Sequence, residues 1–187
     1  MKKYVLTIIF MLAVSISIQA AEAATSQNTG KGIGSFFNHF VWGADIGSSI
    51  DLSSNDMSSI DINAYFGYKN SIIRALGVGA DIQSAFGNNH TLIPVYVLFR
   101  SSFRSQPSLC FLDLRGGYSF NRFRSNYTQS GAFASAGVGF NLFSNSKFNS
   151  HIIMAYNFFQ MDSYGSETEL YDVNNLSSVS IRLGISF

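Results

Sequence analysis

Seven charged residues are spaced so that they could do chemistry in the interior of a protein. They fall on matching sides of alternating segments, and the set is Asp45, Asp61, Asp81, Asp113, Arg100, Arg115 and Arg182. An unpaired buried charge costs several kcal/mol, so acids and bases gathered in one interior must pair or change protonation. A relay for protons or ions is one interpretation, and a structural network of ion pairs is the one that we favour. We expect Arg100 to lie near Asp113 and Arg182 to lie near Asp45.

Eight segments with a period of two position these charges. In residues 40–51, for example, Trp42, Ile46 and Ile50 alternate with small or polar residues that include Asp45. Such alternation is typical of a β-strand with one apolar and one polar face. The eight segments are residues 40–51, 60–68, 76–83, 93–100, 111–120, 133–142, 151–158 and 179–187.

The connections between these segments also alternate in length. Those after the second, fourth and sixth segments are short or moderate, whereas those after the first, fifth and seventh are longer and more polar. This pattern is typical of a transmembrane barrel whose two termini share the short-turn side. About eleven residues of tilted strand, at roughly 3.3 Å each, span ~27 Å, which matches the apolar band of such a barrel. The sequence therefore predicts an all-β fold, an eight-stranded antiparallel up-and-down transmembrane β-barrel.

Large aromatic residues share the polar faces with the charges. Eight strands leave just enough interior space for side chains, and Tyr65, Tyr96, Phe111 and Phe133 would fill it. We therefore expect a plugged lumen rather than a diffusive pore. The alternation alone also fits a soluble barrel with its faces reversed, so a soluble, secreted all-β binding protein remains an alternative.

The first residues form an export signal. Lys2 and Lys3 precede an apolar run over residues 4–18, and residues 21–23 supply small residues at the positions that a signal peptidase reads. The run is short for a membrane helix, which needs about 20 residues. We expect a cleaved signal peptide at residues 1–23, an N-terminal tail at 24–38 and the barrel at 39–187. Cleavage would leave equal numbers of acidic and basic residues.

The composition excludes several classes of protein. The chain is 47% apolar and 15% aromatic but only 12% charged, which is unlike a disordered chain. A net charge of +1 without clustered Lys and Arg argues against nucleic acid as a partner. Cys110 is the one cysteine, so an exported form has no intramolecular disulfide.

Glycine-punctuated strands and the terminal strand carry a resemblance to a known family. The motifs are Gly77-Val78-Gly79, Asp113-Leu114-Arg115-Gly116-Gly117-Tyr118, Gly137-Val138-Gly139 and the strand from Ser180 to Phe187. With its eight segments, the chain from residue 39 onward resembles the small eight-stranded outer-membrane barrel superfamily, similar to the OmpA and OmpX type of transmembrane domain. The resemblance implies a Gram-negative type outer membrane, periplasmic termini, and contact with lipid including lipopolysaccharide. It also implies that Phe187, Ile185 and Leu183 form the signal read by the barrel-assembly machinery.

The positions of the three histidines bear on an alternative interpretation, that the barrel is an enzyme. The predicted topology puts His39 and His151 at the periplasmic end and His90 in an outer loop, so the three cannot converge on one triad. His90 with Ser84 or Ser130 stays open as a nucleophilic pair. We expect no catalytic residue, cofactor or metal ligand. The second choice is a lipid-modifying barrel enzyme or a narrow transporter of a small lipid-like ligand.

The outer loops are expected to carry the function, as a structural or surface-interaction role with an unidentified extracellular partner. One loop is acidic, through Asp162, Glu167, Glu169 and Asp172. These carboxylates could bind Ca²⁺ or Mg²⁺ bridging lipopolysaccharide phosphates, although a solvated loop is the simpler interpretation. Arg122, Arg124 and Tyr127 could contact lipid phosphates, and Tyr164 and Tyr171 could contact a partner.

Details of the strands lead to three further expectations. Pro94 cannot donate to a ladder, so we expect a β-bulge beside it. In the alternation of its strand, Arg74 falls on the same face as the lipid-facing residues. Its side chain should therefore extend to the headgroups. Phe40, Trp42, Tyr68 and Phe187 should form an interfacial aromatic girdle at the periplasmic strand ends.

Overall fold

The computed structural model describes residues 39–53, 57–70, 72–86, 90–103, 109–123, 128–144, 148–161, 164–166, 169–171 and 175–187. The chain divides into two units, Met1–Phe40 and Val41–Phe187, and the second unit contains the barrel. The expected signal peptide and tail, residues 1–38, lie outside the described residues. Within the described part of the chain, no helix is both long enough and apolar enough to cross a membrane.

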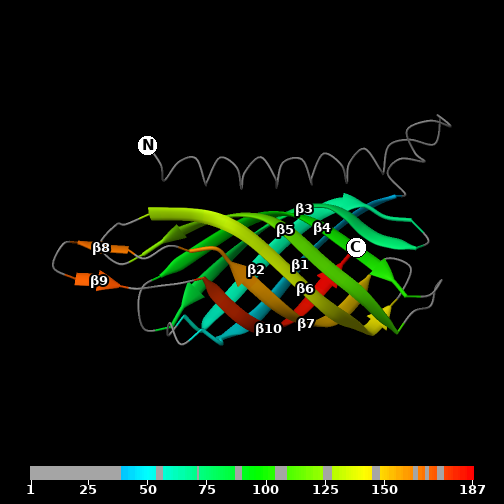
Figure 1. The fold of residues 1–187 in the computed structure, drawn as a ribbon. Coiled ribbons are helices and arrows are strands. Elements are labelled where there is room, and N and C mark those ends of the chain that lie inside the picture. Colours follow the sequence, from blue (N-terminus) through cyan, green and yellow to red (C-terminus); the bar gives the residue numbers. More distant parts are fainter. Residues whose placement is uncertain are drawn as a thin grey trace. The chain divides into compact units, whose positions relative to one another are not determined.

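Eight antiparallel strands form a closed barrel, as the sequence predicts (Figure 1). They are β1 (Phe40–Asp51), β2 (Ser59–Tyr68), β3 (Ile73–Ala85), β4 (Thr91–Ser102), β5 (Cys110–Arg122), β6 (Thr128–Ser144), β7 (Asn149–Phe159) and β10 (Leu176–Ser186). Their order around the barrel is β1-β10-β7-β6-β5-β4-β3-β2. A separate hairpin of β8 (Tyr164–Ser166) and β9 (Glu169–Tyr171) lies between β7 and β10 in the chain and projects beyond the barrel strands in Figure 1.

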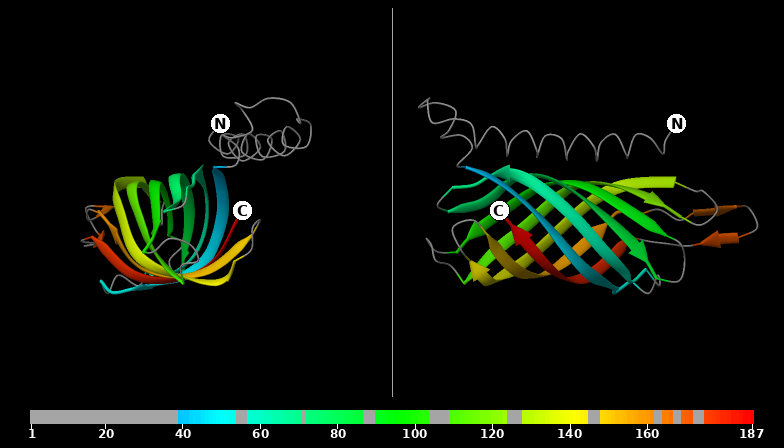
Figure 2. Two further views of the ribbon diagram at one scale, coloured as in Figure 1. Left: turned by 90° about the vertical axis from the view of Figure 1, so that its right-hand side faces the viewer. Right: turned by 180° about the vertical axis from the view of Figure 1, so that it is seen from behind.

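The first and last strands close the barrel. β1 pairs with β10 from Gly43 opposite Ser186 to Asp51 opposite Ser178, and the two strands lie side by side in Figure 2. Beyond this ladder the N–H of Phe187 donates to the carbonyl oxygen of Trp42 at 2.9 Å. The rings of Trp42 and Phe187 are stacked, with centroids 4.5 Å apart. We call this the terminal end of the barrel, and the opposite end, which carries the connections after β1, β3, β5 and β7, the loop end.

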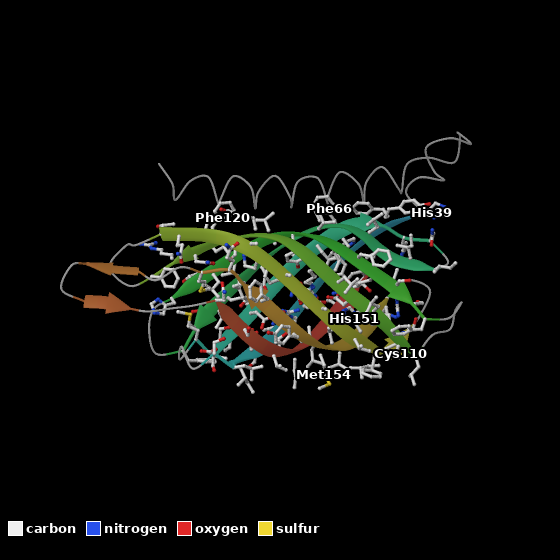
Figure 3. The ribbon with its side chains drawn as sticks, in the orientation of Figure 1. His39, Phe66, Cys110, Phe120, His151 and Met154 are labelled. Carbon is white, nitrogen blue, oxygen red and sulfur yellow. The ribbon has the colours of Figure 1, made fainter. Side chains whose placement is uncertain are left out.

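The apolar faces of the strands point outward. Ile46, Val97 and Met154 are each more than half exposed, whereas Asp113 and Arg182 have no exposed surface. Figure 3 shows Phe66, Phe120 and Met154 directed away from the barrel and His151 within it. This packing is the reverse of a soluble barrel, in which the apolar faces form the core. The soluble alternative is therefore inconsistent with the structure.

Two β-bulges lie near the terminal end. The register of β3 against β4 shifts between Ile73 and Ala75, and that of β6 against β7 shifts between Asn141 and Phe143. The expected bulge beside Pro94 is wrong. Ala80 pairs with Val95 and Gln83 with Leu92, so the register is the same on both sides of the proline. The missing N–H of Pro94 interrupts this ladder locally, and no extra residue is inserted.

Candidate functional site

Buried side chains line the lumen, and those at the loop end include a group of apolar residues. Its members are Met57, Leu92, Phe123, Phe159, Met161 and Leu176, all of them buried. The ring of Phe133 lies 4.8 Å from that of Phe159 and continues the group inward. We call these six residues and Phe133 the apolar plug. The six come from the ends of five different strands, β2, β4, β5, β7 and β10, on this side of the lumen.

A cluster of two aspartates and two arginines occupies the lumen nearer the terminal end. Asp113 accepts from Arg100 Nε at 2.5 Å and from Arg115 Nε at 2.8 Å. Asp45 accepts from Arg100 Nη2 at 2.8 Å and from Arg115 Nη2 at 3.0 Å. The predicted pair of Arg100 and Asp113 is present. Each carboxylate is shared by both guanidiniums, so the four charges balance within the cluster.

His151 and Tyr65 extend this cluster and were not predicted to belong to it. His151 Nε2 lies 2.9 Å from Asp45 Oδ1 and 3.2 Å from Arg100 Nη1. Arg100 Nη1 also donates to the hydroxyl of Tyr65 at 2.6 Å. The sequence did contain an indication of this position. His151 and Asn157 fall on the same face of β7 in the alternating pattern, and both are buried.

Arg182 belongs to a second, separate group. Its Nε donates to Asp61 Oδ2 at 2.9 Å, and its Nη2 donates to Asn157 Oδ1 at 2.8 Å. The predicted pairing of Arg182 with Asp45 is therefore wrong. Arg182 lies opposite Gly47 in the β1–β10 register, whereas Asp45 lies opposite Gly184. From its position opposite Gly47, the long arginine side chain reaches β2 on one side and β7 on the other.

Asp81 is the predicted lumen residue that lies apart from both groups. Gln83 Nε2 donates to Asp81 Oδ2 at 2.8 Å. Among the described residues Asp81 forms no ion pair, and its Oδ1 atom is buried without a hydrogen-bond partner. The structure thus joins six of the seven predicted residues in ion pairs and leaves this aspartate without one.

Arg74 points into the barrel, so the expectation that it extends to lipid headgroups is wrong. Its guanidinium lies over the ring of Phe111, 4.7 Å from the centroid, and Phe111 is buried in the lumen. The cause is the bulge between Ile73 and Ala75, which inserts Arg74 as an extra residue opposite β4. An extra residue interrupts the alternation of faces, so the alternating pattern predicts the wrong face for Arg74.

Glycines on the inner faces make room for aromatic rings. A methyl group added at Gly139 would overlap the ring of Phe111, and one added at Gly79 would overlap the ring of Tyr96. A methyl group at Gly184 would collide with Asp45 and with His151. The Gly-x-Gly pairs of the sequence thus serve packing inside the barrel, as their position on strands indicated.

The residues of the enzyme alternative lie on opposite faces. His90 is buried, and its ring lies edge-on to that of Phe123 at 5.1 Å. Ser84 and Ser130 are exposed on the outer faces of β3 and β6. The barrel wall therefore separates this imidazole from both hydroxyls. In the described part of the chain, no three His, Cys, Asp or Glu residues are grouped to hold a metal ion.

The predicted loop residues fall partly outside the described part of the chain. Asp162, Glu167, Asp172, Arg124 and Tyr127 lie outside the described residues. Tyr164, Glu169 and Tyr171 belong to the β8–β9 hairpin, which is described by its backbone alone. Arg122 ends β5 at the loop end, with its side chain exposed.

The barrel is similar to solved structures of bacterial outer-membrane proteins. Neisserial surface protein A matches with a TM-score of 0.54 and 18% identity over 79% of this chain and 95% of that protein. The N-terminal β-barrel domain of OprF from Pseudomonas aeruginosa matches at 0.46 and 10% identity, covering 79% and 97% of the two chains. OprG from the same organism matches at 0.45 and 12% identity, covering 80% and 96%.

At these identities the similarity is one of fold. The chain has the transmembrane fold of the small eight-stranded outer-membrane barrels, which confirms the resemblance at the level of architecture. The sequence matches no family model and no curated protein.

Proposed function

We propose that the protein is an outer-membrane β-barrel with a closed lumen and a structural or surface-interaction role. The observation that carries this proposal is the reversal of faces in the barrel. Ile62, Val97 and Leu183 are each more than half exposed, whereas Asp61, Asp113 and Arg182 have no exposed surface. A belt of exposed aliphatic side chains around a charged interior is unstable in water and is the arrangement that a bilayer requires.

Two groups of side chains inside the barrel, one apolar and one charged, support the proposed closure of the lumen. The apolar plug occupies the loop end, and the cluster around Asp45 bridges the strands nearer the terminal end. Arg100 on β4 reaches Asp45 on β1, and these strands are not neighbours in the barrel. A hydrated ion would have to break this bridge and displace the plug. We therefore propose a role without open-pore conductance.

The proposed location is the outer membrane of a Gram-negative type cell, with periplasmic termini. In this proposal Phe187, Ile185 and Leu183 act as the assembly signal, and lipid including lipopolysaccharide surrounds the belt. Ile185 and Leu183 alternate with inward residues at the end of β10, and Phe187 stacks on Trp42 at the rim. The barrel-assembly machinery is thus a proposed partner during biogenesis.

The proposed interacting surface is the set of connections at the loop end, and the proposal includes neither catalysis nor a cofactor. The chain there supplies carboxylates, arginines and tyrosines, and the β8–β9 hairpin gives the last connection a backbone scaffold. The enzyme alternative lacks support from the His90 region, because its candidate serines face outward.

Gel mobility of the membrane-extracted chain tests the barrel. The full chain, residues 1–187, is expressed, the outer-membrane fraction is extracted in detergent, and samples are run with and without boiling. We expect faster migration before boiling, because a closed barrel resists SDS unfolding. Recovery in the soluble fraction without a heat shift would contradict the proposal.

Planar bilayer recordings on the same sample test the closed lumen. We expect no steps in the nanosiemens range. A variant that removes the bridge, Arg100→Ala combined with Phe159→Ala from the plug, provides the comparison. Stable openings in the unmodified protein would overturn the proposed closure and leave the membrane location intact.

A further inference from the structure

A cavity of about 210 Å³ lies at the terminal end of the lumen. Its wall includes Val41, Tyr65, Arg74, Phe111, His151 and Phe187. Lys69 and Arg100 also line it, whereas none of the aspartates and glutamates in the described part of the chain does. The cavity is smaller than the roughly 300–1,000 Å³ of sites for drug-sized ligands, so it suits a small group.

Two residues of this wall have a buried polar atom without a hydrogen-bond partner among the described residues, Arg74 through Nη1 and Asn149 through Oδ1, and Arg74 is the charged one. Its Nη1 atom is buried and has no hydrogen-bond partner in the described part of the chain. The guanidinium is held against the face of Phe111, an apolar contact that leaves the edge N–H groups available. A buried donor without an acceptor is costly, and a charged donor more so. No described residue, Asn149 included, accepts a hydrogen bond from this Nη1 atom, so a ligand in the cavity would supply the missing acceptor.

The predicted aspartates of the lumen do not provide this acceptor. Asp45 and Asp113 are shared by Arg100 and Arg115, and Asp61 pairs with Arg182. Asp81 remains, and it lies on the same strand as Arg74. At roughly 3.3 Å per residue the two are about 23 Å apart along β3, too far to interact directly.

We propose that the cavity at the terminal end binds a phosphate group, with Arg74 as its main anchor. Arginine suits this role because its planar guanidinium presents paired N–H donors that match phosphate oxygens. Ser144, Asn149 and Ser186 line the same wall and carry further donors. The site shares Arg100 with the bridge of the proposed closed lumen, but its test does not depend on that closure, and the site lies at the opposite end from the loop-end surface.

Two sources of phosphate fit this chemistry, a soluble phosphate and the headgroup of a phospholipid. The rim beside the cavity is aromatic, since the ring of Phe148 lies 5.5 Å from that of Phe187, which stacks on Trp42. Such rings sit at the level of lipid headgroups in membrane barrels. The experiment therefore includes one arm for each source.

The first arm uses the folded chain in micelles of an uncharged detergent that contains no phosphate. Sodium phosphate is titrated at constant ionic strength and followed by calorimetry, with the fluorescence of Trp42, the single tryptophan, as a second readout. We expect saturable binding that Arg74→Gln weakens about tenfold or more, because hydrogen bonds to charged groups contribute that much. Arg74→Lys should bind with intermediate affinity, since it keeps the charge but loses the planar fork.

The matched control is Arg122→Gln, which makes the same change in charge at the loop end. We expect this variant to bind phosphate like the unmodified chain. A heat-shift gel establishes that each variant is folded before titration. If Arg74→Gln does not fold, the comparison of Arg74→Lys with the unmodified chain decides.

The second arm adds phosphatidic acid to the micelles and measures displacement of bound phosphate. Displacement assigns the site to a lipid headgroup, and its absence assigns the site to soluble phosphate. The proposal is overturned if the unmodified folded chain shows no saturable binding of either probe. It is equally overturned if the Arg74 variants bind as tightly as the unmodified chain.

Discussion

Arg100 on β4 reaches across the lumen to Asp45 on β1, with Nη2 2.8 Å from Oδ2. Two strands, β2 and β3, separate these residues around the barrel wall. The bridge therefore connects strands that are not adjacent in the barrel wall, which the hydrogen bonds between neighbouring strands do not do. Asp45 also accepts from Arg115, so its removal affects two arginines.

The first prediction is that Asp45→Asn destabilises the barrel strongly. The change leaves Arg100 and Arg115 with one carboxylate between them, and breaking a buried ion pair by removing one partner costs about 3–5 kcal/mol. Equilibrium unfolding in urea, from lipid vesicles or micelles, measures the change in the free energy of unfolding.

Asp81→Asn is the matched control for this prediction. It makes the same change of type in the same lumen, but Asp81 has no ion pair among the described residues. We expect Asp81→Asn to leave the stability unchanged or to raise it. Equal losses in the two variants would show that the bridge adds nothing beyond the burial of a carboxylate.

The sequence was sufficient for the fold and for most of the lumen, because alternation with a period of two specifies which side chains share a face. The face of Arg74 was predicted wrongly, because one inserted residue on β3 changes the face and no local motif marks the insertion. The partner of Arg182 was also predicted wrongly, because the alternating pattern does not give the register of β10 against β1. Long arginine side chains reach beyond their own strand pair, so the actual partner depends on three-dimensional distances.

The second prediction concerns the space that glycine leaves for Phe111. Gly139→Ala should destabilise the barrel, because the added methyl group would overlap the Phe111 ring, which lies against Arg74 and His151. Overpacking of this kind costs about 1–3 kcal/mol. Unfolding in urea measures the loss.

Gly116→Ala on the outer face of β5 is the control, because a methyl group there meets nothing within 4 Å. We expect this variant to match the unmodified barrel or to exceed its stability slightly, since alanine is less flexible in the unfolded chain. A loss as large as that of Gly139→Ala would mean that backbone effects, not the ring, explain both.

The third prediction tests the contact that closes the barrel. Phe187→Ala removes the ring stacked on Trp42, and Trp42 is the single tryptophan of the chain. We expect a shifted Trp42 emission in the folded barrel and, if Phe187 serves as the assembly signal, less protein in the outer membrane. Phe187→Tyr keeps an aromatic ring and should restore both properties. Normal outer-membrane levels of Phe187→Ala would remove the proposed signal while leaving the spectroscopic prediction standing.

The fourth prediction distinguishes a lipid-facing belt from a surface in water. Val97 lies midway along β4 and Ile50 near the loop end of β1, and both side chains are more than half exposed. In a bilayer, an arginine costs about 2–4 kcal/mol at the midplane but only about 0–1 kcal/mol near the interface. We therefore expect Val97→Arg to destabilise the barrel in lipid vesicles much more than Ile50→Arg does, as measured by urea unfolding.

In water both positions would accept arginine with little cost, because exposed substitutions change stability by about 0.5 kcal/mol at most. Equal and small losses for the two variants would thus contradict the membrane-spanning belt, whereas a loss that depends on depth has no explanation in a soluble barrel.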